Sequence, residues 1–192
     1  MVPTTTVTRQ DRLKSANVSL QGLSVGDAFG EQFFISPNEV ETRIRNRQLP
    51  PAPWPVTDDT VMALSIVDVL AKRERIDCDL LAALFGKRYR WDSARGYGGT
   101  AHDILSRLAS GRAWRELSVG VFGGLGSMGN GGAMRAAPIG AYFFDDFLRA
   151  AEEAKRSAAV THAGTLSGAF VTWRWSGGPP LIGRTPSDPV WS

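Results

Sequence analysis

The chain has 192 residues, 43% of them hydrophobic and 21% charged, which is the size and composition of one ordinary domain able to bury about 70% of its unfolded surface. This composition excludes a disordered chain, and the sequence has no run of about 18 apolar residues that could span a membrane. The 22 basic and 19 acidic side chains are scattered and leave a net charge of +3, so we expect no nucleic-acid partner.

The N-terminal part of the sequence predicts two helices. Apolar residues recur at steps of three and four between Leu13 and Leu23, which places them on one face of a helix that runs toward Gly26. Residues 36–39 read Ser-Pro-Asn-Glu, a capping-box pattern with proline at the first helical position. This pattern predicts a second, short helix that ends before Pro50.

A proline-rich connector precedes the most regular helical pattern. Four prolines in residues 49–55 cannot sustain a helix, because proline lacks the amide donor and disfavours helical geometry in the residue before it. Thr57 can then cap a helix whose apolar residues follow the helical period from Val61 to Leu70. The basic residues 72–73 suit its C-terminal end.

The rest of the chain continues as helices and glycine-rich loops. No segment alternates long enough to predict a strand, and the two glycine-rich segments share no repeat. We therefore expect an all-α class, a compact bundle of many helices. The predicted helices cover residues 79–90, 101–109, 114–119, 133–143 and 145–161, and the glycine-rich segments are residues 96–100 and 120–132.

The single cysteine and the first residues bear on the compartment. Cys78 has no second cysteine to pair with, and its acidic neighbours raise the pKa of a thiol, so we expect a buried and unreactive cysteine. Residues 1–20 contain no apolar core of a secretion signal. A cytoplasmic location is the expectation.

The residues Thr-Asp-Asp-Thr at positions 57–60 are the clearest candidate for chemistry. Two adjacent carboxylates and two hydroxyls at a helix N-terminus offer the hard oxygen ligands that Mg²⁺ prefers. The same residues are also typical of a threonine N-cap followed by an acidic first turn, which needs no metal. Both interpretations stand at this level.

The glycine-rich segments invite a ligand-binding interpretation. Glycines in residues 129–135 would let backbone amides approach a phosphate closely, and Asn130 offers both a donor and an acceptor. Residues 96–100 suggest the same role. The alternative for both segments is a loop that leads into a helix, since neither matches a P-loop or a Rossmann fingerprint.

Two acids and two histidines complete the candidates. Asp27 and Glu31 lie among small residues, where a carboxylate could act as a general base or metal ligand, or where the small residues could simply allow tight helix packing. His102 is expected to be structural. The role of His162 depends on its neighbours in the fold.

Five motifs in one order resemble the ADP-ribosylglycohydrolase family, and five in order are far more specific than any one. The resemblance covers about residues 13–162. The motifs are residues 22–30, 54–64, 96–100, 129–140 and 159–162, which read GLSVGDAFG, WPVTDDTVMAL, GYGGT, GNGGAMRAAPIG and AVTH.

The resemblance implies an all-helical hydrolase that uses a pair of Mg²⁺ ions to cleave the bond between ADP-ribose and a modified protein side chain or a small conjugate. By position it implies that Thr57, Asp58 and Asp59 bind metal and that Asp58, Asp59 and Glu31 are catalytic, Glu31 being the weakest match because the spacing around it varies in the family. It further implies that ADP-ribose contacts Gly96, Gly98, Thr100, Ser127, Met128, Gly129, Asn130 and His162.

The sequence also departs from the family pattern. The second Asp-x-Asp-Thr metal motif that the family carries in a later helix is missing, and Asp188 is the only acid after His162. Residues 163–192 form an atypical tail, so residues 1–192 are expected to be a single, incomplete domain with impaired activity and one or no Mg²⁺. The alternatives are a protein that binds ADP-ribose without hydrolysis and a subunit that needs a complementing chain.

Overall fold

The computed structural model describes residues 6–120 and 130–162. Within these ranges the chain forms eight α-helices and one 3-10 helix and contains no strand, which confirms the expected all-α class. No helix in the described part is both long and apolar enough to cross a membrane. The elements are α1 (Arg9–Glu31), α2 (Pro37–Arg45), α3 (Asp58–Arg73), α4 (Cys78–Trp91), α5 (Gly99–Ala109), α6 (Trp114–Gly120), η2 (Asn130–Gly132), α7 (Ala137–Tyr142) and α8 (Phe147–Ala159).

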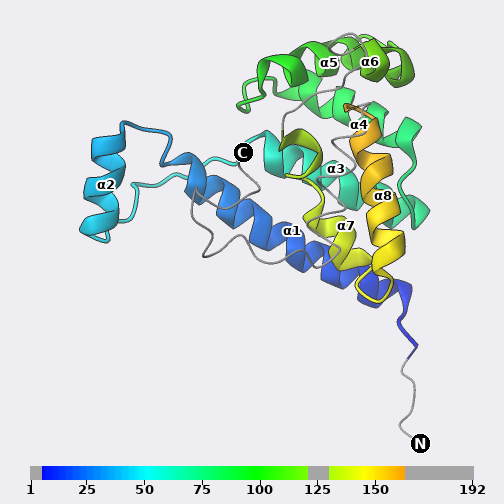
Figure 1. The fold of residues 1–192 in the computed structure, drawn as a ribbon, viewed down its shortest axis with the longest axis horizontal. Helices are drawn as coiled ribbons and strands as arrows, with labels where there is room; N and C mark the ends of the chain where they lie inside the picture. The colour runs from blue at the N-terminus through cyan, green and yellow to red at the C-terminus, as the bar shows by residue number, and fades with distance from the viewer. Residues whose placement is uncertain (1–5, 121–129, 163–192) are drawn as a thin grey trace, which may run out of the picture.

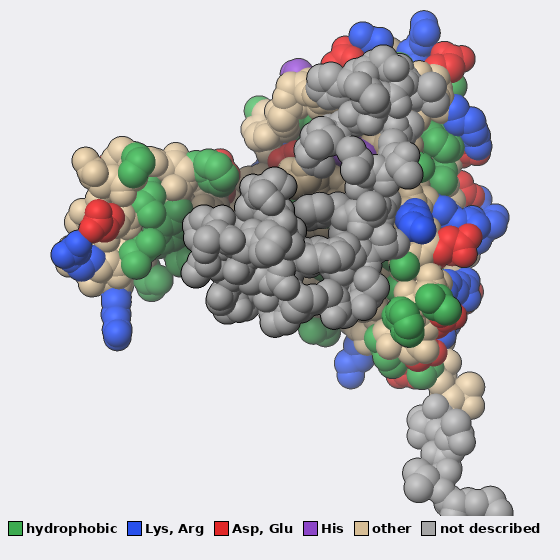
Figure 2. Space-filling view, viewed as in Figure 1, with side chains coloured by type: hydrophobic (Ala, Val, Ile, Leu, Met, Phe, Trp, Pro, Cys, Tyr) green, Lys and Arg blue, Asp and Glu red, His purple; other side chains and the backbone are tan. Residues whose placement is uncertain are grey.

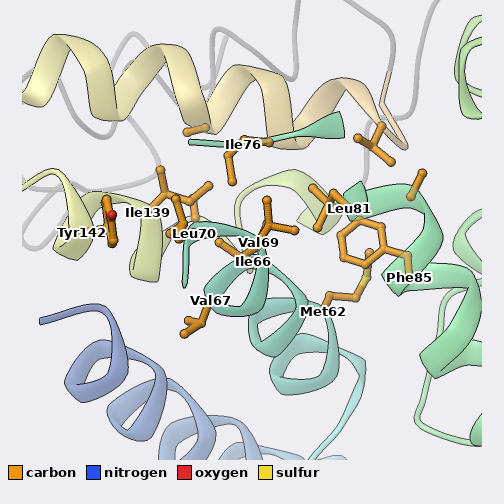
Figure 3. Packing of buried hydrophobic residues seen from close by; sticks show 14 of the residues in the cluster. Met62, Ile66, Val67, Val69, Leu70, Ile76, Leu81, Phe85, Ile139 and Tyr142 are labelled. Carbon is orange, nitrogen blue, oxygen red and sulfur yellow. The ribbon is translucent and has the colours of Figure 1, made fainter. Parts of the chain in front are cut away.

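The helix α3 is the centre of the hydrophobic core. It packs against α1, α4 and α7, and Figure 3 shows its side chains meeting those of the neighbouring helices. Val67 points toward α1, whereas Ile66 lies among residues that include Ile139 of α7 and Phe85 of α4. Each aliphatic side chain fully buried in this way contributes about 1.5–3 kcal/mol of hydrophobic stabilisation.

The first helix is longer than its hydrophobic pattern predicts. It begins at Arg9, because Thr8 and Asp11 form a reciprocal capping box, and it continues through Gly26 to Glu31. The N-terminal part lies along the bundle, and the C-terminal part extends beyond it toward α2, which stands apart from the other helices (Figure 1). The predicted N-cap of α2 is confirmed, because the Ser36 hydroxyl accepts from the Glu39 amide.

The projecting region around α2 exposes apolar side chains. Phe34, Ile44 and Leu49 are each more than half exposed, and Figure 2 shows hydrophobic side chains gathered on this part of the molecule. Charged side chains of both signs mix along the opposite side of the same view. The core is therefore concentrated around α3, and α2 adds little to it.

The continuous helix predicted for residues 133–143 is wrong. The structure has the short η2 helix first, and α7 begins only at Ala137 with Pro138 in its first turn. Proline is tolerated there because the first amides of a helix have no intrahelical acceptor, but it cannot occupy a helix interior without losing a hydrogen bond. Pro138 therefore divides the segment that hydrophobicity alone would join.

The environment of Cys78 agrees with an unreactive thiol. The side chain is partly buried, and its sulfur donates a 3.5 Å hydrogen bond to the Arg156 carbonyl. Burial raises the pKa of the thiol, and the neighbouring carboxylates Asp77 and Asp79 act in the same direction. A thiol in this state is a poor nucleophile.

Close packing of α4 on α5 makes Gly86 sensitive to substitution. A Cβ at Gly86 would lie 2.9 Å from the Ala109 amide nitrogen, and backbone cannot move aside as a flexible side chain can. We expect Gly86→Ala to lower the free energy of unfolding by about 1–3 kcal/mol, measured by urea denaturation. The matched control is Gly22→Ala in α1, where no described atom lies within 4 Å of the new Cβ and a gain of about 0.4–1 kcal/mol is expected. Equal effects of the two variants would contradict this account.

Candidate functional site

A cleft of about 730 Å³ opens between α1, the N-terminus of α3, the loop before α5 and η2. All four elements carry motifs that the sequence singles out, so segments far apart in the chain meet at one place. The described residues that line the cleft are Leu23, Gly26, Asp27, Gly30, Glu31, Phe34, Thr57, Asp58, Asp59, Gly96, Gly98, Asn130 and Met134.

Asp27 of α1 joins the cleft to the start of α3. Its Oδ2 accepts the Thr57 amide at 2.8 Å and the Thr60 amide at 3.3 Å. The hydroxyls of the same two threonines donate to Asp27 at 2.5 Å each. One carboxylate thus satisfies two amides that the helix leaves without acceptors, at the end where its dipole favours negative charge.

The N-cap of α3 is the residue that the sequence predicts. The Thr57 hydroxyl accepts from the Asp59 amide at 3.3 Å while it donates to Asp27. The Asp58 amide instead donates to the Arg95 carbonyl at 2.7 Å. The first turn of α3 is therefore held from two sides, by α1 and by the loop before α5.

Asp58 and Asp59 are partly buried carboxylates that repel each other and their neighbours. Desolvation, followed by repulsion from Asp59, raises the pKa of Asp58 from 3.8 to about 6, and Asp27 and Glu31 add to the shift. Desolvation also raises the pKa of Asp59, with Asp27 and Glu31 contributing. The cleft therefore carries more negative charge than its own side chains neutralise, and carboxylate oxygens in such a place are ligands for a hard cation.

The loop before α5 brings a glycine against Asp58. Gly96 has a φ of 82°, a conformation that favours glycine, and a Cβ there would lie 3.9 Å from Asp58 Oδ1. Arg95 fixes the loop, since its side chain donates to the Asp92 carboxylate at 2.6 Å and to the Val56 carbonyl at 3.1 Å. Gly98 is the N-cap of α5 and leaves that helix end without a capping side chain.

The remaining residues named by the resemblance fall into three groups. Asn130 is exposed and lines the cleft with Glu31. Thr100 lies in the first turn of α5 and His162 is buried behind η2 against Gly131, and neither is among the residues that line the cleft. Ser127, Met128 and Gly129 lie outside the described residues.

The other histidine, His102, has a nearby partner. His102 contacts the Tyr89 hydroxyl at 3.0 Å through Nδ1, and the two rings pack edge to face. Tyr97 packs edge to face on the same tyrosine, and burial with the nearby Asp58 charge raises the pKa of Tyr97 to about 12. This aromatic group fixes Tyr97, the neighbour of Gly96 in the loop.

The chain is similar to proteins of a known family. A family model described as ADP-ribosylglycohydrolase matches residues 5–174. The chain belongs to the ADP-ribosylglycohydrolase family. It is 39% identical over 113 residues to ADP-ribosylhydrolase ARH3 of Gallus gallus, 36% over 112 residues to that of Homo sapiens and 36% over 114 residues to that of Xenopus tropicalis. Each match covers 57% of this chain but only 30%, 31% and 32% of the respective relative, so this ADP-ribosylglycohydrolase family member aligns with about a third of their length.

Two residues gain an importance that their sequence patterns did not reveal. Asp27 is one of two acids in a run of small residues, and only the fold shows that it holds α3. Arg135 is the last residue of the second glycine motif and is fully buried in this family member. The signal for Asp27 was its place in a motif, but nothing local distinguishes it from Glu31.

Asp27 is expected to stabilise the fold through its bonds to α3. In Asp27→Asn one acceptor oxygen becomes a donor that faces other donors, so the free energy of unfolding should fall by about 1–3 kcal/mol, measured by urea denaturation. The control is Glu31→Gln, which removes an acid from the same cleft without touching the α3 cap and should change stability by less than about 0.5 kcal/mol. A comparable loss in both variants would show that the bonds of Asp27 to α3 are not what stabilises the fold at this position.

The raised pKa of Asp58 predicts a pH dependence of stability. The folded state binds the Asp58 proton more tightly than the unfolded chain, whose value is near 3.8, so the free energy of unfolding falls as pH rises from about 4 to about 6. Asp58→Asn should therefore raise Tm at pH 7 and leave it unchanged near pH 4, in calorimetric scans with a chelator present. Asp103→Asn, an exposed acid on α5, is the control. If Asp58→Asn shows the same dependence of Tm on pH as the wild type, Asp58 is not the group responsible.

Proposed function

We propose that this chain binds ADP-ribose in the cleft and cleaves the glycosidic bond that joins ADP-ribose to a modified protein side chain or a small conjugate. The observation that carries the proposal is the meeting of Asp58 and Asp59 with Gly96, Gly98 and Asn130 around one cleft, in a member of the ADP-ribosylglycohydrolase family. The similarity of the chain to three proteins named ADP-ribosylhydrolase supports it.

The shape of the cleft suits a nucleotide-sized ligand. Its volume of about 730 Å³ is within the range of small-molecule sites. Gly96 and Gly98 leave room for a ligand to approach the backbone, and the amides at the N-terminus of α5 favour an anion. We propose that the segment from Ser127 to Asn130 holds the diphosphate and ribose. Thr100 in the first turn of α5 and His162 behind η2 are proposed to support the ligand-binding segments beside them.

The acidic wall is proposed to hold a divalent cation, because the anionic diphosphate and the unneutralised carboxylates would otherwise repel each other. Thr57, Asp58 and Asp59 offer hydroxyl and carboxylate oxygens, which are ligands of the type Mg²⁺ accepts. In the described residues no three acidic, histidine or cysteine side chains gather as a metal cluster, and an ion held by positions 57–59 would complete its coordination with waters. Such an ion would orient ribose hydroxyls and polarise a water near the anomeric carbon.

The other residues of the cleft then have distinct roles. Asp27 keeps its oxygens on the α3 amides and threonine hydroxyls, and so positions the Asp58–Asp59 turn without itself being needed as a ligand. Glu31 faces the same space, where a carboxylate can accept the proton of an attacking water as the glycosidic bond breaks. With Asp58 and Asp59, Glu31 is the proposed catalytic set.

A second candidate is binding without hydrolysis. For this candidate, binding needs only the glycine-lined side of the cleft and Asn130, whereas hydrolysis also needs the carboxylates of Asp58 and Asp59. A chain of this kind would recognise ADP-ribose or an ADP-ribosylated protein, alone or with a complementing chain that supplies the other ligands. Turnover of ADP-ribosylated substrate distinguishes the two candidates.

Binding of ADP-ribose is expected to need Mg²⁺ and the two aspartates. Calorimetry of the wild type with and without Mg²⁺, and of an Asp58→Ala, Asp59→Ala double variant, should show an affinity lower by about 10–100-fold when either the ion or the carboxylates are removed. Asp103→Ala, which removes an exposed charge that does not line the cleft, should bind as the wild type does. Binding by the double variant at full strength would exclude the proposed metal role, and no binding by folded wild type would exclude the function.

A further inference from the structure

Arg135 is a fully buried cation that contacts only neutral groups in the described part of the chain. Its Nε donates to Ser157 Oγ at 3.1 Å, and its Nη2 donates to the Ser157 carbonyl and to Thr161 Oγ1, both at 2.8 Å. The guanidinium also lies 4.9 Å from the centre of the Phe85 ring. Burial without a carboxylate is costly, and it lowers the pKa of Arg135 to about 9.

The position of Arg135 at the end of α8 offsets part of this cost. Ser157 belongs to the last turn of α8, whose carbonyls carry the negative end of the helix dipole. The planar guanidinium spans Ser157 and Thr161 at once, which a lysine ammonium cannot do with the same geometry. Arg135 therefore anchors the end of α8 to the segment that follows η2.

The hydrogen bonds of Thr161 determine the direction of the next contact. Arg135 has only donors, so Thr161 Oγ1 accepts from it and keeps its own hydrogen to donate. The other partner of Oγ1 is His162 Nδ1, at 2.7 Å. Among the described residues Nδ1 is the one acceptor within reach of this hydroxyl hydrogen, so Nδ1 accepts and the proton of a neutral imidazole resides on Nε2.

We propose that Arg135 and Thr161 are positioning residues that hold His162 as the neutral tautomer protonated at Nε2. The Nε2 edge then presents a donor beside η2, whose first residue, Asn130, lines the cleft. This inference extends the proposed function by making His162 a fixed support of η2, the element that carries Asn130 into the cleft. The tautomer itself does not depend on that function.

Two further observations support the arrangement. A Cβ at Gly131 would lie 2.7 Å from Cε1 and 3.2 Å from Nε2 of His162, so the ring packs directly against the backbone of η2. Burial and the Arg135 charge lower the pKa of His162 to about 4, which keeps the ring neutral at physiological pH. A change at Thr161 therefore reaches η2 through one rigid ring.

The tautomer can be measured directly by long-range ¹H–¹⁵N correlation spectra of the full chain. The protein has two histidines, so a His102→Gln variant assigns the signals of His162. In the wild type we expect His162 to show a protonated Nε2 and an unprotonated Nδ1. The opposite tautomer, or a charged ring at neutral pH, would overturn the proposal.

Variants of Thr161 separate positioning from bulk structure. Thr161→Val keeps the shape but removes the hydroxyl, and should give mixed tautomers, whereas Thr161→Ser keeps the hydroxyl and should restore the wild-type pattern. Arg135→Lys, if it folds, should give mixed tautomers as Thr161→Val does. If it does not fold, the comparison of Thr161→Val with Thr161→Ser is sufficient to test the proposal. Wild-type spectra from Thr161→Val would overturn the role of Thr161.

Calorimetry with ADP-ribose then connects the tautomer to the site. Thr161→Val should bind about tenfold more weakly than the wild type, and Thr161→Ser should bind as the wild type does. If the wild type shows the expected tautomer but does not bind ADP-ribose, the proposed function fails, and the positioning of His162 by Arg135 and Thr161 stands. If ADP-ribose binds equally to all three proteins, the tautomer of His162 does not affect the site, and the proposed effect on ligand binding is wrong.

Discussion

The arrangement depends on the carboxylate of Asp27, which accepts four hydrogen bonds at the N-terminus of α3. The apolar side of α3 forms the centre of the core, while its first turn carries Asp58 and Asp59 into the cleft. One helix thus connects stability to the candidate site. Since α1 supplies the carboxylate, the packing of α1 on α3 also sets where the two aspartates stand.

The acids of the cleft lower the stability of the folded protein, and this loss indicates that they serve a function. Desolvation and mutual repulsion raise the pKa of Asp58 to about 6, although a more dispersed arrangement of acids would avoid this. Groups held in such unfavourable electrostatic surroundings concentrate at functional sites. A cation would relieve the repulsion and bridge the acidic wall to an anionic ligand, which is why the metal and ADP-ribose proposals belong together.

The second polar centre lies behind η2 and has the opposite charge. Arg135 there is paired with a helix end, two hydroxyls and an aromatic ring instead of an acid. A buried polar network of this kind is worth keeping when it fixes one geometry, because each member loses its partner if another moves. Here the fixed geometry ends in His162 against Gly131, at the edge of the cleft wall.

Much of the fold could be predicted from local patterns, and the site only in part. Thr57 and Ser36 were identifiable as N-caps because a cap forms with amides two or three residues away, and the all-α class followed from helical periodicity. The break before α7 was missed, since apolar periodicity outweighed the proline that limits where a helix can start. The motif order revealed the family, but Asp27 and Arg135 act on partners 30 to 33 and 22 to 26 residues away, and such pairings exist only once helices have packed. The identities of the residues therefore settle the helices and the kind of chemistry available, whereas tertiary packing decides which acid holds α3, which acids share a cleft and which atom of His162 carries the proton.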